Sequence, residues 1–525
     1  MTISKKPYSM NRRQVLKSAA ALGAFGALGA FGALGSSAVF AQTGEPKRGG
    51  ILRIGIGGAA TTDPLDPALI ANPATRLFTR QWGDSLIELD KNGIAVGRLA
   101  ASFSPNADAS VWTFVLREGV KFHDGSPLTG EDVAETFRRH LDKNTRSVVA
   151  PMMADFAEIK ADGLNVVITL KAPNTDMPYM LTDYHLPIQP KGGRGNPNAM
   201  IGTGPYKVDV AEPGVRYVLS RNTADWNQNR GFYDGVQIYV MNDMTARTAA
   251  LSAGQVHMIN LVGPKIAARL DTAKNVELRR TPSRGHYAFA AMVDKPPFDN
   301  KDLRLALKYA MNREEIRDKI LFGYGTIGND VPINEAYPLY RNVLEQRPFD
   351  LAKAAEHYRA SGHDGSPIVL NISQAVFPGA VDAGMLWQEN CRKVGIPLQV
   401  KQVPDDGYWE NVWGVQPFTT DNFNGRPVQD LQYSVFYGKG APWNKTHFNN
   451  DEFNQLLVTA RTETDLEARA GMYARMSQIL WEEGGAFIPV FTDFLDASAT
   501  NITGWQVISA DELMGGYAPS LTWFA

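Results

Sequence analysis

The chain has 525 residues, with 53 Lys and Arg against 55 Asp and Glu, and its single cysteine is Cys391. Five basic and no acidic residues fall within 1–41, so the remainder carries 48 basic and 55 acidic residues, a net charge of −7. This balance argues against a nucleic-acid or anionic-membrane partner, both of which favour a basic face. One cysteine excludes an intramolecular disulfide, and the length predicts two or three domains.

The first 41 residues are predicted to be an export signal. Arg12 and Arg13 precede an apolar residue, and an uncharged run rich in Ala and Gly extends to Ala41. The run ends Ala38-Val39-Phe40-Ala41, with small residues at the two positions that a signal peptidase recognises. The segment resembles a twin-arginine signal, which implies a mature protein that begins near Gln42 in a bacterial periplasm. A membrane anchor is the alternative, although the glycines disfavour a helix, and no nearby cysteine is available for lipid attachment.

Short strands and one capped helix are predicted in the first half of the chain. Thr129 is a candidate N-cap, and Asp132 stands at the third position of a helix predicted over 130–142. The strands in this half are predicted at 47–56, 111–117, 166–170 and, as part of a pair that follows Gly204, at 217–220.

Between 294 and 490 amphipathic helices alternate with strands. Such alternation predicts α/β lobes. The helices are predicted at 303–311, 380–394 and 465–481, and the strands at 368–372 and 398–403.

Several short strings, taken in order, resemble the periplasmic solute-binding proteins of ABC importers. The resemblance is to the large family 5, which includes dipeptide-, oligopeptide- and nickel-binding members, and it spans about 48–495. The strings are Gly49-Gly50-Ile51-Leu52-Arg53, Asp63-Pro64-Leu65-Asp66-Pro67, Gly202-Thr203-Gly204-Pro205-Tyr206, and the segments 116–125, 128–133, 295–299, 303–307 and 310–313.

This resemblance implies two α/β lobes with a hinge between them, and an extra subdomain on one lobe. Lobe I is expected to comprise 48–92, 200–293 and 492–525, the extra subdomain 93–199, and lobe II 294–491. Gly202 and Gly204 allow backbone to approach backbone closely, and they are predicted to form the hinge where the chain crosses between lobes.

The function that the resemblance implies is capture of a peptide or similar small organic solute in a cleft between the lobes. The expected partners are that ligand and an ABC permease in the inner membrane, and the protein is expected to be a monomer. An opine-like amino-acid derivative, a sugar or a metal chelate is the alternative ligand. A sensor or chaperone role would share the fold.

Catalytic motifs are missing from the sequence. It contains no Gly-x-Ser-x-Gly elbow, no His-Glu-x-x-His helix and no Cys-x-x-Cys pair. Cys391 is predicted to be a buried apolar residue on the helix 380–394. The protein is therefore predicted not to be an enzyme and to need no metal or cofactor; a periplasmic hydrolase or transferase is the alternative of another class.

Aromatic and polar residues gather between 405 and 447 and are predicted to include the wall of the ligand site. About half of the aromatic side chains are expected to belong to the core instead. The site candidates are Trp409, Asp421, Phe423, Asn424, Arg426, Asp430 and Trp443.

Arg426 is the most specific of these candidates. In peptide-binding relatives, a loop in this region carries an Asp that holds the free amino group of the ligand. Alignment on Gly425 places Arg426 at that position, and an arginine there offers a planar fork to an anion. The sequence therefore predicts an anionic or zwitterionic ligand, with Asp421, Asn424 or Asp430 available for a cationic group. The alternative is a salt bridge from Arg426 to Asp430 within the lobe.

Overall fold

The computed structural model describes residues 45–374, 376–377, 379–441 and 443–525. The predicted signal at 1–41, including Arg12 and Arg13, lies outside these residues. No helix within the described residues is long and apolar enough to cross a membrane.

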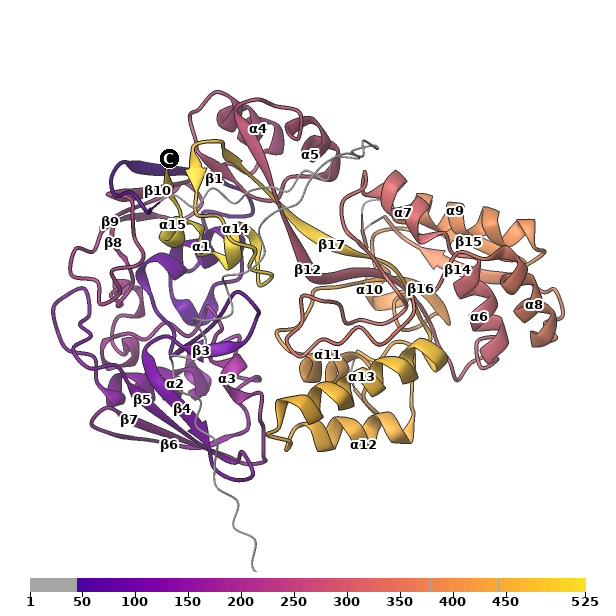
Figure 1. Cartoon of the computed structure of the whole chain (residues 1–525), viewed down its shortest axis with the longest axis horizontal. Coiled ribbons are helices and arrows are strands. Elements are labelled where there is room, and N and C mark those ends of the chain that lie inside the picture. Colours follow the sequence, from indigo (N-terminus) through magenta and orange to yellow (C-terminus); the bar gives the residue numbers. More distant parts are fainter. Residues whose placement is uncertain (1–44, 375, 378, 442) are drawn as a thin grey trace, which may run out of the picture. The chain divides into compact units, whose positions relative to one another are not determined.

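One large mixed sheet extends through both lobes (Figure 1). Within the described residues it has eleven strands, ten of them in the order β15-β14-β16-β12-β17-β11-β1-β10-β9-β8, while β13 pairs with β17. Its strands are β1 (Ile51–Ile56), β8 (Tyr206–Glu212), β9 (Arg216–Arg221), β10 (Gly235–Val240), β11 (Met258–Ile259), β12 (Val276–Ala291), β13 (Thr326–Ile327), β14 (Ile368–Ile372), β15 (Leu398–Gln402), β16 (Phe418–Phe423) and β17 (Ala486–Ala499).

The first lobe is defined here by the apolar cores around β1 and β11. Leu52, Ile54 and Tyr217 are fully buried in one of these cores, and Ile259 and Ala497 in the other. Its helices and small strands are α1 (Pro73–Trp82), α4 (Met244–Ser252), α5 (Pro264–Leu270), α14 (Glu512–Gly515), α15 (Ala518–Leu521), β18 (Ile502–Thr503) and β19 (Trp523–Phe524).

A separate core marks the subdomain, which packs around Phe114, Phe137 and Ile168. The predicted capping box of its helix is confirmed, since Thr129 Oγ1 accepts from the Asp132 amide at 3.3 Å while Asp132 accepts from the Thr129 amide at 2.9 Å. The subdomain elements are β2 (Ile87–Leu89), β3 (Ala95–Gly97), β4 (Ala100–Pro105), β5 (Val111–Leu116), α2 (Gly130–Leu141), β6 (Phe156–Asp162), β7 (Asn165–Leu170) and α3 (Met177–Met180).

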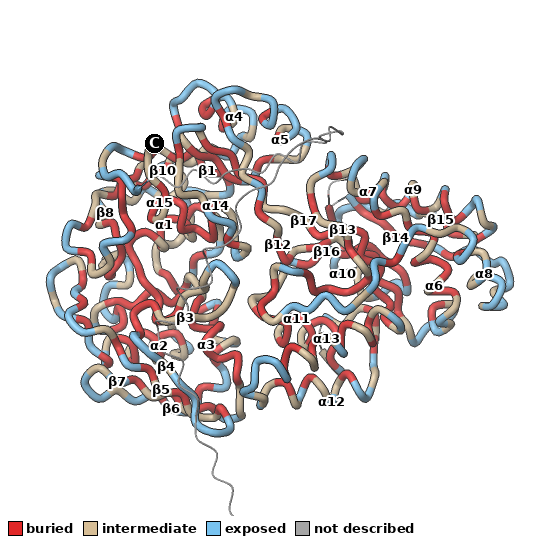
Figure 2. Tube along the Cα trace, in the orientation of Figure 1, coloured by how far each residue is buried: buried red, intermediate tan, exposed pale blue. Residues whose placement is uncertain are grey.

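The second lobe has two cores, one on each face of β12. Phe289 and Ala291 enter one core, while Ala288 enters the other, as the alternation of a strand requires. Figure 2 shows buried residues along these strands, and the predicted burial of Cys391 is confirmed. The helices of this lobe are α6 (Lys301–Tyr309), α7 (Arg313–Ile320), α8 (Leu351–Ser361), α9 (Ala380–Lys393), α10 (Tyr408–Asn411), α11 (Gln429–Phe436), α12 (Asp451–Ala460) and α13 (Leu466–Glu483).

The two long strands β12 and β17 carry the chain from one lobe to the other (Figure 1). They pair antiparallel from Val276 opposite Ala499 to Ala290 opposite Ala486. The register shifts between Pro282 and His286, so the regular pairing is interrupted between the two lobes. Interruptions of this kind bend a strand and turn its side chains in new directions.

The predicted placement of Gly202 and Gly204 at a crossing between the lobes is wrong. They lie on the segment that returns from the subdomain to β8, against the end of α1. A Cβ on Gly202 would lie 2.4 Å from the Trp82 carbonyl oxygen, and one on Gly204 2.5 Å from that of Gln81. The predicted close approach of backbone is therefore present, but it holds the subdomain to the first lobe.

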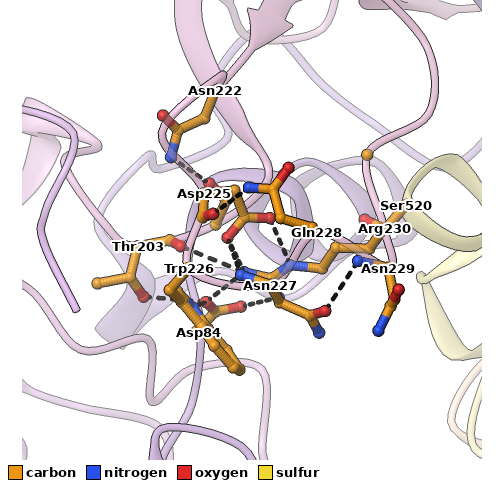
Figure 3. A network of polar contacts seen from close by, with 12 residues as sticks. Asp84, Thr203, Asn222, Asp225, Trp226, Asn227, Gln228, Asn229, Arg230 and Ser520 are labelled. Atoms are coloured by element: carbon orange, nitrogen blue, oxygen red, sulfur yellow. Dashed lines mark hydrogen bonds and ion pairs between the residues drawn. The ribbon is translucent and has the colours of Figure 1, made fainter. Parts of the chain in front are cut away.

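A buried polar network lies at the same junction (Figure 3). Asp84 is its centre and is fully buried; it pairs with Arg98 at 2.6 Å and with Arg230 at 2.8 Å. The Thr203 hydroxyl and the Trp226 indole also donate to Asp84, at 3.0 and 2.9 Å. Both chain segments that connect the subdomain with the first lobe are thus tied to one carboxylate. We call these residues, together with Asp225, which pairs with Arg230, the Asp84 network.

Candidate functional site

A cavity of about 170 Å³ lies between the two lobes. It adjoins a second cavity of about 380 Å³, and the two share Leu89, Arg284, Ile508 and Ala510 as lining residues. The first lobe and subdomain contribute most of the wall, and the second lobe contributes Arg284, Gly425 and Pro427. Sites that combine apolar surface with a few directed polar groups are typical of small-molecule binding.

Helix α1 places two arginines on the same face of this cavity. Its N-terminus is fixed by Asn72, whose side chain accepts from the Thr75 amide at 3.1 Å, and by Pro73 in the first turn. Arg76 and Arg80 are four residues apart, so they lie one turn above each other. Both line the cavity.

Acidic residues of the C-terminal segment neutralise Arg76. It pairs with Asp511 at 3.0 Å and with Glu512 at 3.3 Å. Burial, together with the charge of Asp511, raises the pKa of Glu512 to about 9. Both acids therefore hold Arg76 at the wall of the cavity.

The hydrogen-bond partners of Arg80 among the described residues are both uncharged. It donates to the Tyr517 hydroxyl at 2.7 Å and to the Thr182 carbonyl oxygen at 2.9 Å, and its guanidinium lies 4.9 Å from the centre of the Tyr517 ring. Asp183 also lines the cavity, but its Oδ1 contacts His185 Nδ1 at 2.5 Å. These contacts hold the Arg80 side chain at the wall without a direct ion pair in the described part of the chain.

Arg284 is the charged residue that the second lobe contributes. It lies on β12, within the interrupted stretch between Pro282 and His286. Its Nε donates to the Ala336 carbonyl oxygen at 2.8 Å, and its guanidinium lies 5.4 Å from the Tyr337 ring centre. Burial lowers the pKa of Arg284, and no carboxylate among the described residues pairs with it.

Gly425 is the residue that lets the loop after β16 approach Arg284. A Cβ at position 425 would lie 1.9 Å from the Arg284 Cβ and 2.6 Å from its carbonyl carbon. No side chain fits there unless β12 or the loop moves. The glycine on which the sequence alignment rests therefore lies at the cavity, next to an arginine that the alignment did not identify.

We expect Gly425→Ala to lower the free energy of unfolding by roughly 1–3 kcal/mol, because an extra methyl in this contact forces the backbone apart. Urea unfolding measures the change. Gly471→Ala is the matched control, because Gly471 lies on helix α13 and a Cβ there meets nothing closer than 4.0 Å. That control should be neutral or up to about 1 kcal/mol stabilising. Equal stability of wild type and Gly425→Ala would contradict the close contact.

The structure places Arg426 beside the cavity but not among the residues that line it. Its guanidinium lies 5.4 Å from the ring centre of Phe436 and 5.2 Å from that of Trp443. Its Nε is buried without a hydrogen-bond partner among the described residues. The predicted alternative, a salt bridge to Asp430, is also not formed, because Asp430 pairs with Arg461 at 2.9 Å.

The other predicted site residues also lie outside the lining of this cavity. Phe423 packs on Phe436 in a core of the second lobe, with ring centres 4.7 Å apart. Asp421 is fully buried; its Oδ1 accepts from the Asn422 amide at 2.9 Å, and burial raises its pKa to about 7. The three remaining candidates are more open to solvent: Asn424, Trp409 and Trp443.

Sequence reasoning missed the three arginines of the cavity. Arg76 and Arg80 carried a usable signal, since two arginines at i and i+4 follow a helix start at Asn72-Pro73. Arg284 carried none, because its position depends on an interruption of β12 and on the approach of Gly425, 141 residues further along the chain. No group of three or more potential metal ligands is found in the described part of the chain.

A second contact joins the lobes through the subdomain. Asp176, just before α3, pairs with Arg469 of α13 at 2.5 Å, and both side chains are buried. The Thr175 amide donates to the Arg461 carbonyl oxygen at 2.9 Å, and the Tyr473 hydroxyl contacts Asp176 at 3.4 Å. We call the Asp176–Arg469 pair the interlobe ion pair.

Comparisons with known proteins agree on one family. The model of bacterial extracellular solute-binding proteins, family 5 (middle part), matches residues 95–445. The glutathione-binding protein GsiB of Shigella flexneri is 24% identical over 478 residues, which cover 87% of this chain and 91% of GsiB.

Solved structures share the fold. HbpA2 from Haemophilus parasuis has a TM-score of 0.82 at 20% identity, with 91% of this chain and 100% of that chain covered. DppA from Helicobacter pylori, in complex with the peptide STSA, has a TM-score of 0.68 at 19% identity, with 91% and 99% covered. The α/β fold of two lobes predicted from the sequence is confirmed. Because the family model spans most of the chain, the protein belongs to the bacterial extracellular solute-binding proteins of family 5.

Proposed function

We propose that the protein is the solute-binding component of an ABC importer and captures a small peptide-like solute between its two lobes. The observation that carries the proposal is a cavity lined from both lobes in a chain of this family. The names of GsiB and of the DppA complex, which concern glutathione and a peptide, support peptide-like solutes as the ligand class. A ligand that touches both lobes stabilises the closed form by its higher affinity for that form.

The closed form would then deliver the solute to a permease in the inner membrane. We further propose that the protein acts as a monomer, and that its domains are divided near 92, 199 and 491 as the sequence predicts. The predicted boundary near 293 is replaced by one near 285, because Ala288, Phe289 and Ala291 pack in the cores of the second lobe. Arg426, Asp430 and their neighbours remain proposed contributors to the site, through the position of the loop that carries Gly425.

The test offers the purified protein a defined mixture of di- to pentapeptides together with glutathione. Native mass spectrometry identifies what is retained, and small-angle scattering measures the radius of gyration with and without it. We expect a retained peptide to be recovered unchanged and the radius of gyration to fall. Cleaved or modified peptides would favour the alternative of a periplasmic hydrolase or transferase, and no retention would contradict the peptide class.

Export is proposed to follow the twin-arginine route. The double substitution Arg12→Lys and Arg13→Lys keeps the charge of the signal but removes the arginine pair. We expect precursor to accumulate in the cytoplasm, measured by fractionation and immunoblotting. The single substitution Lys17→Arg is the control and should leave export unchanged. Export of the double variant at the level of the wild type would exclude this route.

A further inference from the structure

The guanidinium of Arg284 lies at the cavity with unused hydrogen-bonding capacity. The residue is only 7% exposed, yet its terminal nitrogens have no hydrogen-bond partner among the described residues, and Nε alone is bound, to Ala336. These nitrogens are not fully buried, so they are open to the space beside them, which is the cavity. Arginines that are this enclosed normally face a carboxylate.

The acids that line the cavity contact groups other than Arg284. The three lining arginines are Arg76, Arg80 and Arg284, and the lining acids are Asp183, Asp511 and Glu512. Asp511 and Glu512 contact Arg76, and burial together with the charge of Asp511 raises the pKa of Glu512. Asp183 lies beside His185. Asp90 and Glu335 line the adjoining cavity together with Arg284, but no carboxylate among the described residues pairs with its guanidinium.

Arg284 also lies where the two lobes meet. It belongs to β12 of the crossing, and a Cβ on Gly93 of the subdomain would be 3.4 Å from its Nη2. On the opposite wall, Arg80 is held by Tyr517 and Thr182. A group that bound both guanidinium groups would therefore contact both sides of the cavity at once.

We propose that Arg284 is a specificity-determining residue, and that the solute carries a carboxylate that binds its guanidinium and faces Arg80 across the cavity. The planar fork of arginine suits two parallel hydrogen bonds to a carboxylate. The inference deepens the proposed function and rests on it. It transfers the anion-binding role that the sequence assigned to Arg426, in the loop after β16, to an arginine on β12.

The anion contributes to closure as well as to selectivity. Its contacts to both walls exist only when the lobes are together, so its binding energy favours the closed form. A solute with an uncharged amide in place of the carboxylate leaves Arg284 enclosed without a counter-charge, and such a solute binds more weakly.

The experiment compares matched pairs of peptides, each as the free acid and as the C-terminal amide. The set includes amidated peptides with and without a Glu side chain, so that a carboxylate at the terminus and one on a side chain are told apart. The expected result is retention of acids over neutral amides by at least about 30-fold. If an amidated peptide with a Glu side chain were retained as well as the free acid, the inference would be supported, and the carboxylate would be that of the side chain.

Variants assign the selectivity to one residue. Arg284→Gln is expected to reduce the preference for acids to within about threefold, and Arg284→Lys, which keeps the charge but not the fork, to give an intermediate value. Arg216→Gln is the control, because it removes one charge from an exposed pair with Glu212. The circular dichroism spectrum of each variant reports whether it folds, and the selectivity of the wild type tests the inference even if Arg284→Gln does not fold.

Three results would overturn the inference. Equal retention of acids and neutral amides would exclude the anion while leaving the proposed function intact. Loss of selectivity in Arg426→Gln but not in Arg284→Gln would restore the assignment made from the sequence. Retention of no peptide by the wild type would remove the proposed function and this inference together.

Discussion

Replacing Asp84 by Asn is expected to lower the free energy of unfolding by about 3–5 kcal/mol, the cost of removing one partner from a buried ion pair. Asp84 is fully buried between Arg98 and Arg230. Asn keeps the shape of the side chain but removes its charge, so both guanidinium groups lose their shared counter-charge. Urea unfolding, followed by tryptophan fluorescence, measures the effect.

Glu212→Gln is the matched control for Asp84→Asn. It also removes a carboxylate from an arginine, but Glu212 and Arg216 lie on the surface with about half of each side chain exposed. Such exposed pairs contribute between about 0 and 1 kcal/mol. If both variants unfolded at the same urea concentration, the Asp84 network would not be the stabilising element of the junction.

The pH dependence gives a second measure of the same network. Burial alone would raise the pKa of Asp84, but Arg230 and Arg98 outweigh it and hold this pKa far below its usual value. The unfolded chain therefore binds a proton near pH 4, where the folded protein does not. The stability that Asp84 supplies is fully present above about pH 4 and is lost as the pH falls below it. The difference between wild type and Asp84→Asn should shrink over that range.

Local signals in the sequence predicted several elements well. The helix predicted over 130–142 is observed at Gly130–Leu141, and the strand predicted over 368–372 is observed at Ile368–Ile372. Both depend on residues close together in the chain, such as the cap formed by Thr129 and Asp132. Apolar periodicity and capping act over one or two turns, and a sequence displays them directly.

The site depended on contacts that a sequence does not display. Asp84 and Arg230 are 146 residues apart, and nothing near either of them in the sequence distinguishes it from a charged residue on the surface. The same holds for Arg284 and Gly425, whose contact sets the arginine at the cavity wall. The ungapped alignment rested on Gly425, which lines the cavity. It then assigned the anion-binding role to the adjacent Arg426, because the pairing of β12 with β16 was not visible in the sequence.

The hinge prediction was wrong for a related reason. Glycines at 202 and 204 indicate that another backbone segment lies close to this one, but the sequence does not identify that segment. Here it is the end of α1, inside the junction that the Asp84 network holds. Strands β12 and β17 make the crossing between the lobes. Their register is interrupted between Pro282 and His286, and Arg284 lies in this interruption.

The interlobe ion pair gives the second large effect. Asp176→Asn leaves Arg469 buried without a charged partner, and its Nε already has no hydrogen-bond partner among the described residues. Truncating one partner of such a pair costs about 2–5 kcal/mol. Here the lobes can separate and expose Arg469 to water, so the cost falls on the closed form rather than on folding. The ligand-free protein should then populate an open form with a larger radius of gyration.

Hydrogen exchange locates the effect at a single amide. The Thr175 amide donates to the Arg461 carbonyl oxygen across the same contact, so it exchanges only when the lobes part. We expect exchange at Thr175 to become at least about tenfold faster in Asp176→Asn, since each 1.4 kcal/mol corresponds to a factor of ten. Amides in the Asp84 network, which lie at the other junction of the subdomain, should exchange as in the wild type.

A control on α13, the helix that carries Arg469, separates the effect of the interlobe ion pair from the effect of removing any charge. Glu452→Gln breaks a pair between α12 and α13, with Arg475, that lies on the surface within the second lobe. It should change neither the radius of gyration nor exchange at Thr175. The double variant Asp176→Asn, Arg469→Gln should exchange more slowly than Asp176→Asn, because no buried charge is then left unpaired. Wild-type protection of Thr175 in Asp176→Asn would mean that apolar contacts, and not this pair, hold the subdomain against the second lobe.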